Sequence, residues 1–257
     1  MKEVLAFLFL MCIIPIQSQN LLPEFMNPKV YYEVKGKVKT VEVRLYNTFK
    51  NGKRVMVDDE SDDYDVYNKY FFNRVGDVDS LIYIFTEITE EKNLGKTSFE
   101  KGVPVIEWNG IIMGNDTVFK TRKELVYKLT EDKNILNYTK NIDIETGKIT
   151  TEIDTTIIDY KNQSIRINLS SFSFTQFYEN KRLVKIVNES KNEHMYTQKY
   201  VYQDDLLVKE YMKTNDYLGE KTYQYSNIDT NGNWLSRTIT ELDIIINVTK
   251  REIDYWE

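Results

Sequence analysis

The sequence predicts an all-β fold, an antiparallel meander of tyrosine-rich hairpins that forms one extended or curled sheet. Three observations predict it. Apolar and polar residues alternate with a period of two, short polar turns separate the alternating segments, and one hairpin motif recurs at a fixed spacing. Alternation of this kind places every second side chain on one face of a strand. We therefore expect strands with one buried face and one wet face.

The clearest alternating segment begins at Val38 and continues through Val41, Val43 and Leu45, with charged residues between the last three. Similar alternation recurs at Ile165, Ile167 and Leu169, at Phe172 and Phe174, at Tyr200 and Tyr202, and at Tyr223 and Tyr225. β-branched and aromatic residues of this kind favour strands. Helical periodicity is weaker, and its two candidates are residues 86–93 and 116–129.

Short polar turns lie between these segments. Asn51-Gly52 and Asn231-Gly232 supply the positive φ angles that tight hairpins require. Other turns are rich in Asn, Asp, Glu and Lys, at residues 131–134, 145–148, 162–163, 179–181 and 203–205. Several hairpins at regular spacing indicate an antiparallel meander.

A repeat is the strongest sign of internal organisation. The segment from Tyr178 to Lys185 aligns with that from Tyr202 to Lys209, because Tyr, Leu, Val and Lys coincide. A looser third copy runs from Tyr225 to Arg237. Hairpins of fixed period usually stack into one sheet in which each unit covers its neighbour's apolar face.

These segments carry a resemblance to a known group. The Tyr-x-Tyr pairs, the turn from Asn231 to Trp234, Arg237 and the closing residues 251–256 resemble the C-terminal part of small exported bacterial proteins with YD-repeat-like (RHS-like) hairpins. The resemblance covers residues 172–256. Strict Tyr-Asp dipeptides are missing, since Gln203 follows Tyr202 and Ser226 follows Tyr225. The resemblance implies a sheet architecture and an exported location, and it carries no catalytic residue to this chain.

The first 19 residues have the pattern of a secretory signal peptide. Lys2 precedes an apolar run from Val4 to Ile16, and polar residues 17–19 follow. The run is too short for a membrane span, although an uncleaved anchor is the alternative. Cys12 lies within this run without the small residues that lipidation needs, so the mature chain has no thiol. We expect export to the periplasm, to an outer-membrane-associated position or to the exterior.

The remaining chain has an indistinct boundary near Glu100. It separates an N-terminal β subregion at 20–100 from a hairpin region at 101–257. A net charge of −6 and a pI of 5.2 argue against nucleic-acid binding. No later segment is apolar enough to cross a bilayer as a helix. Charged residues interrupt most strands, which argues against a membrane barrel.

Few residues suggest chemistry. His194 is the only histidine and lies in a polar stretch, so neither a serine-type triad nor a histidine zinc site is expected. The acidic run contains candidate Ca²⁺ ligands, namely Asp58, Asp59, Asp62 and Asp63. Such a run is usually a solvated loop, so we predict no metal site. We predict no cofactor.

Trp108, Trp234 and Trp256 are candidate ligand-binding residues because indole rings can stack on sugars, but packing against the sheet is the interpretation we favour for each of them. We therefore predict a non-enzymatic structural or interaction protein of the bacterial cell envelope, with an unknown protein or glycan partner. One alternative is a carbohydrate- or peptide-binding module that uses exposed aromatics or a sheet edge. Another is a secreted hydrolase with two carboxylates about 5–10 Å apart.

Overall fold

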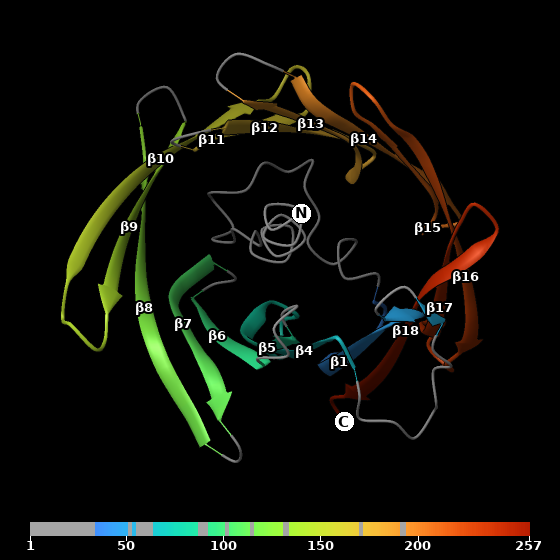
Figure 1. Ribbon diagram of the computed structural model, residues 1–257, viewed down its shortest axis with the longest axis horizontal. Helices are drawn as coiled ribbons and strands as arrows, with labels where there is room; N and C mark the ends of the chain where they lie inside the picture. The colour runs from blue at the N-terminus through green and yellow to red at the C-terminus, as the bar shows by residue number, and fades with distance from the viewer. Residues whose placement is uncertain are drawn as a thin grey trace.

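The computed structural model describes residues 34–50, 53–54, 64–86, 92–100, 103–113, 116–130, 134–169, 172–190 and 194–257. Within them, 16 antiparallel strands close into a barrel (Figure 1). The barrel strands are β1 (Val38–Asn47), β4 (Val66–Phe72), β5 (Val78–Thr86), β6 (Lys92–Glu100), β7 (Val103–Met113), β8 (Asp116–Leu129), β9 (Ile135–Asp143), β10 (Ile149–Asp159), β11 (Ser164–Asn168), β12 (Phe172–Glu179), β13 (Arg182–Ser190), β14 (His194–Gln203), β15 (Leu206–Lys213), β16 (Leu218–Ile228), β17 (Trp234–Glu241) and β18 (Ile244–Tyr255).

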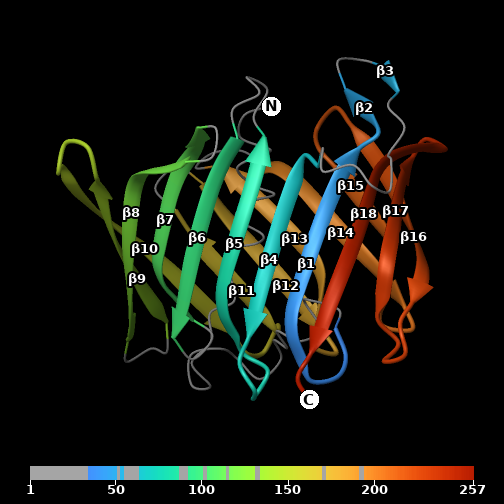
Figure 2. The same ribbon diagram turned by 90° about the horizontal axis from the view of Figure 1, so that it is seen from below.

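Closure overturns the predicted extended or curled sheet. Each barrel strand pairs with its neighbour in sequence, and β1 also pairs with β18 through partners such as Val41 and Ile253. Among the described strands, only the small hairpin of β2 (Phe49–Lys50) and β3 (Lys53–Arg54) lies outside this order, between β1 and β4 (Figure 2). The all-β class was predicted correctly, but the barrel formed by the described strands has no open edge, which is one of the two features on which the predicted binding module could rely.

The tyrosine motif has a local structural cause. In the turns of β12–β13 and β14–β15, positive φ angles fall on Asn180-Lys181 and Asp204-Asp205, and a bulge precedes each turn. The Tyr202 hydroxyl donates to the Leu183 carbonyl at 3.0 Å. The Tyr225 hydroxyl makes the same bond to Leu207 at 2.7 Å. Each tyrosine therefore ties its hairpin to the one before it.

These hairpins are nevertheless consecutive strands of one closed wall. The description as a stack of hairpin repeats, and with it the YD-repeat-like resemblance, is wrong for this chain. The turns determine only how neighbouring strands pair. Similar turns therefore do not show how the whole sheet is arranged. Closure depends on the pairing of β1 with β18, whose partners are about 200 residues apart, as in the bond between Asn47 and Asn247.

The expected strands at 38–45 and 165–169 are present as β1 and β11, whereas the helix candidate at 116–129 is strand β8. The strands on either side of Glu100, β6 and β7, pair with each other inside the barrel. The domain boundary near that residue stays a prediction. The signal peptide and the acidic run at 58–65, apart from its last two residues, lie outside the described residues.

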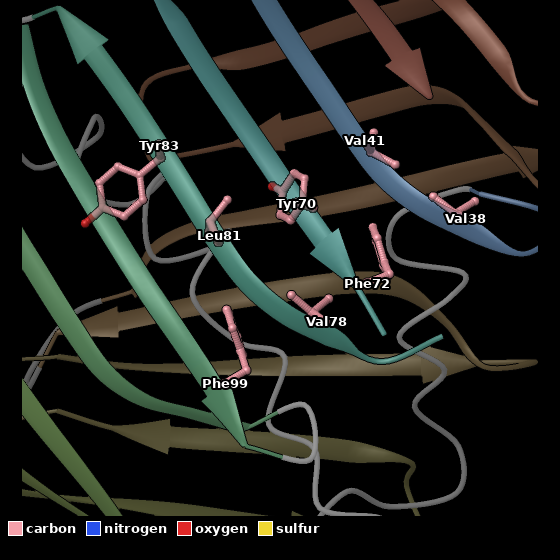
Figure 3. Packing of buried hydrophobic residues seen from close by; sticks show 8 residues of the cluster. All are labelled: Val38, Val41, Tyr70, Phe72, Val78, Leu81, Tyr83 and Phe99. Atoms are coloured by element: carbon pink, nitrogen blue, oxygen red, sulfur yellow. The ribbon is translucent and has the colours of Figure 1, made fainter. Parts of the chain in front are cut away.

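Two apolar clusters lie on opposite parts of the wall and face inward. The first joins β1, β4, β5 and β6 (Figure 3), and its buried members are Val38, Val41, Tyr70, Phe72, Val78, Leu81, Tyr83 and Phe99. The second joins β11, β12 and β13, with β-branched and aromatic members Ile165, Ile167, Phe174, Tyr178 and Ile186. Because the concave side of a closed sheet crowds its side chains, these positions are buried while their neighbours in sequence are more exposed.

The Asn231-Gly232 turn also ties the start of the described chain to the barrel. Gly232 has a φ of 78°, which suits glycine. Asn233 is buried and donates to the Lys35 carbonyl at 3.0 Å, while its own side-chain oxygen accepts from the Lys35 backbone amide at 2.6 Å. The asparagine of this motif is thus used for structure.

Candidate functional site: the inner and outer faces of the barrel wall

The inner face carries polar residues between its two apolar clusters. On β14, β15 and β16, Glu210 accepts hydrogen bonds from the Tyr223 hydroxyl at 2.6 Å and from the Gln198 amide at 3.2 Å. Burial and then the Glu210 carboxylate raise the pKa of the Tyr223 phenol. The phenol therefore stays protonated and can donate at any physiological pH. This network is a satisfied polar part of the core.

Next to it, two arginines stack on one buried indole. The Arg251 guanidinium carbon lies 4.0 Å from the ring centroid of Trp234, and that of Arg237 lies 4.9 Å away. The Tyr225 ring is 5.4 Å from the same indole. Trp234 is only 4% exposed. Cation–π attraction grows when water is excluded, so this group is well suited to hold β16, β17 and β18 together.

A third group lies on β6, β7 and β8. Glu107 pairs in register with Thr97 on one side and Lys123 on the other. The Lys123 ammonium is 3.9 Å from one carboxylate oxygen, and the other oxygen has no hydrogen-bond partner among the described residues. Burial raises the pKa of Glu107, and the Lys123 charge opposes that rise.

We expect Glu107→Gln to stabilise the protein at neutral pH by on the order of 1 kcal/mol, because a buried charge with weak pairing is costly. A raised pKa in the folded state gives stability that is complete below the unfolded pKa and is lost as pH rises through the folded value. The advantage of the Gln variant should therefore grow from acidic to neutral pH in urea unfolding. Glu210→Gln is the matched control: it removes the charge that Tyr223 and Gln198 donate to, and should destabilise. Equal responses of the two variants would contradict this assignment.

The outer face is marked by rows of ion pairs. Glu42 on β1 pairs with Arg44 and with Lys69 of β4, and Arg44 also pairs with Glu252 of β18. These residues alternate with Val41 and Val43, which belong to or pack against the first inner cluster, so they point outward. Further outward pairs lie within and between strands: Glu124 with Arg122 of the same strand at 3.0 Å and with Lys140 of β9 at 3.2 Å, Lys209 of β15 with Glu220 of β16 at 2.6 Å, and Arg166 of β11 with Glu189 of β13 at 3.5 Å.

Such pairs contribute little stability at a wet surface, but they are informative about surroundings. A lysine or arginine on the lipid face of a membrane barrel costs about 2–4 kcal/mol near the bilayer midplane. Outward charges occur on β1, β4, β8, β9, β15, β16 and β18. These charges favour water over lipid beside the strands that carry them. The described residues contain no helix long and apolar enough to span a membrane.

The three candidate tryptophans lie in different surroundings. Trp234 is buried against the inner arginines, as described above. Trp108 on β7 is half-buried, alternates with the inward Glu107, and packs against Phe119 at 5.6 Å and Arg122 at 5.1 Å. Trp256 follows β18 and lies beneath Lys39 and Arg74. Each ring has its own cationic neighbour.

The remaining candidates from the sequence are the acidic residues and His194. Asp58, Asp59, Asp62 and Asp63 lie outside the described residues. His194 is the first residue of β14, where its backbone pairs with Glu189. Within the described ranges, no group of three or more His, Cys, Asp or Glu residues could hold a metal ion.

Sequence reasoning missed the inner charges, namely Glu107, Glu210, Arg237 and Arg251. One signal was available for Glu107, which is the single charged residue of the segment VPVIEWNGIIM that forms β7. A lone charge in an apolar strand predicts a specific environment for that charge. No comparable signal marks Arg251, because the charges around it are equally dense.

No family model and no curated protein matches the chain. Among solved structures it is similar to a porin-like protein from Bacteroides uniformis ATCC 8492, at 10% identity and a TM-score of 0.33, over 86% of this chain and 99% of the other. A porin-like protein from Bacteroides vulgatus ATCC 8482 gives 9% identity and a TM-score of 0.33, over 87% and 99%. Values this low carry no argument about function.

The architecture itself supports one earlier prediction. Closed antiparallel barrels of an even and large strand number occur in bacterial outer membranes, and the chain has 16 such strands. The barrel architecture thus confirms the predicted exported location, in or around the outer membrane.

Proposed function

We propose that this chain is a non-enzymatic β-barrel of the bacterial cell envelope, with a wall that faces water and an inner face that serves as its working surface. The observation that carries the proposal is the set of outward ion pairs, of which Glu42–Arg44–Glu252 and Arg122–Glu124–Lys140 are the most extensive. They favour an outer-membrane-associated or periplasmic barrel over one embedded in lipid around its whole circumference.

The inner face supports a role in holding a polar partner, for which a glycan or a protein segment is the proposed class. It combines tyrosines and arginines with buried oxygens that have no hydrogen-bond partner among the described residues, including Glu107 Oε1, Thr97 Oγ1 and Asn137 Oδ1. Acceptors of this kind are satisfied by hydroxyl donors. Sugars carry many such hydroxyls.

Purification of the chain from residue 20 onward tests this proposal. We expect a monodisperse protein in buffer without detergent, and release from cell envelopes by carbonate or high salt. A requirement for detergent, together with ion conductance or solute flux in reconstituted liposomes, would overturn it.

Such flux would favour the second candidate, porin-like passage of solutes across the outer membrane. The strand number favours this candidate, because 16-stranded barrels are wide enough for an aqueous channel. Liposome swelling with sugars of increasing size distinguishes the two, since only a barrel that crosses the bilayer admits them.

A further inference from the structure

One part of the outer wall differs from the rest. On β10, Ile149, Ile153 and Ile157 are 56%, 61% and 39% exposed, and Val126 on β8 is 61% exposed. We call these four residues, with the half-buried Tyr138 and Ile142 of β9, the aliphatic patch. Figure 2 shows β8, β9 and β10 side by side at one flank of the barrel.

The register places these residues on one face. Val126 pairs with Tyr138, which pairs with Ile153. Ile142 pairs with Ile149 in the same way. The opposite face holds Thr156, which is buried and accepts a hydrogen bond from Asn137 at 3.0 Å. The patch therefore points away from the interior.

The outward face of β10 is uncharged over a considerable length. Only Thr151 and Thr155 lie between the three isoleucines on that face. At about 3.4 Å per residue, the distance from Ile149 to Ile157 is about 27 Å. A row of exposed isoleucines of this length is unusual for a wall that carries ion pairs elsewhere, and exposed apolar patches mark interaction sites.

The rim of the patch is basic. Outward positions of β8 to β11 carry four cations, Arg122, Lys128, Lys140 and Arg166, against two carboxylates, Glu124 and Asp159. Arg166 also pairs with Glu189 of β13 at 3.5 Å, which leaves one cation more than the carboxylates. Glu124 is already paired with Arg122 and Lys140. Asp159 accepts hydrogen bonds from the Lys161 and Asn162 amides of its own turn. This local excess of positive charge contrasts with the net charge of −6 of the whole chain.

We propose that the aliphatic patch docks against an anionic lipid surface. Its isoleucines and Val126 would enter the boundary between headgroups and acyl chains, and the basic rim would lie beside headgroup phosphates. Trp108 lies next to Arg122 in the same row of the wall, where indole rings are favoured at membrane interfaces. The barrel would attach by one flank while the remaining wall faces water.

A second copy of the chain fits this surface less well. A two-fold symmetric contact through the patch would bring the basic rims of both copies together, and like charges would then oppose the contact. An anionic lipid surface satisfies both the apolar and the charged part of the patch.

Vesicle flotation tests the proposal with the chain from residue 20 onward. We expect binding to phosphatidylcholine vesicles that contain phosphatidylglycerol, weaker binding to phosphatidylcholine alone, and a loss with added salt. The double variant Val126→Asp/Ile153→Asp should lower the affinity about tenfold or more, because two aliphatic side chains leave the interface and two anions enter it. The matched control is Val201→Asp, an exposed valine on the outward face of β14, and it should bind like the wild type.

Three results would overturn the proposal: wild-type protein that does not float, a control that loses binding as much as the double variant, or a dimer in solution that the double variant separates. The inference rests on the proposed water-facing wall, and its failure can be told apart from failure of that function. A protein that is soluble without detergent but does not bind vesicles would refute only the lipid docking of the aliphatic patch. A protein that needs detergent would refute the water-facing wall.

Discussion

Trp234→Ala should lower the free energy of unfolding by about 3–5 kcal/mol, the range for removal of a buried tryptophan. The indole is 4% exposed and lies against the guanidinium groups of Arg251 and Arg237. Its removal leaves a cavity and takes away the ring face that both cations contact. Denaturant unfolding, with the midpoint and the slope analysed together, measures the loss.

Trp256→Ala serves as its control, because Trp256 is only half-buried and follows the last strand. We expect a much smaller change there. The comparison separates two roles for tryptophan: a ligand platform would lose binding with little change in stability, whereas an inner core residue loses stability first. A Trp234 variant as stable as the wild type would contradict the core assignment.

Gly95→Ala should cost about 1–3 kcal/mol through overpacking. Gly95 on β6 pairs in register with Tyr83 on β5, and a Cβ atom at position 95 would overlap the Tyr83 ring. That ring is buried and its hydroxyl donates to the Asn109 side chain on β7. Tyr83 cannot move aside without losing this bond, which spans three strands.

The barrel provides a matched control in Gly219→Ala. A Cβ there would also overlap a tyrosine ring, that of Tyr217, but Tyr217 is 44% exposed. Its hydroxyl donates to Glu241 at the surface, where water can replace that bond if the ring moves into solvent. We expect a loss below about 1 kcal/mol. Thermal and denaturant unfolding of both variants check the pair, and equal losses would show that the buried ring does not restrict Gly95.

Several features could be predicted from sequence because they depend on neighbouring residues. Alternation from Val38 to Leu45 identified β1, and the turn residues at 179–181 and 203–205 identified two hairpins. The recurrent tyrosines were detected as a repeat, and their hydroxyl bonds to Leu183 and Leu207 explain the spacing. The inference from this repeat to an open stack failed, because a hairpin motif contains no information about where the first and last strands go.

The candidate site was less predictable. Period-two alternation states that two faces exist, but not which of them encloses the interior, so the placement of Trp234 against Arg251 and Arg237 could not be anticipated. Their contact joins residues of different strands through the register of β16, β17 and β18. The same holds for the aliphatic patch, whose members come from β8, β9 and β10 and meet only when the register is set.

The sequence by itself determined the β class, the pairing of neighbouring strands and the expected export, since each depends on composition or on residues close in the chain. Only the tertiary structure decided that the sheet closes, that the charged face is the outer one and that one flank is aliphatic. The physical reason is that closure is set by the pairing of β1 with β18 at opposite ends of the chain. Curvature then assigns the crowded face to the interior and the ion-paired face to the exterior.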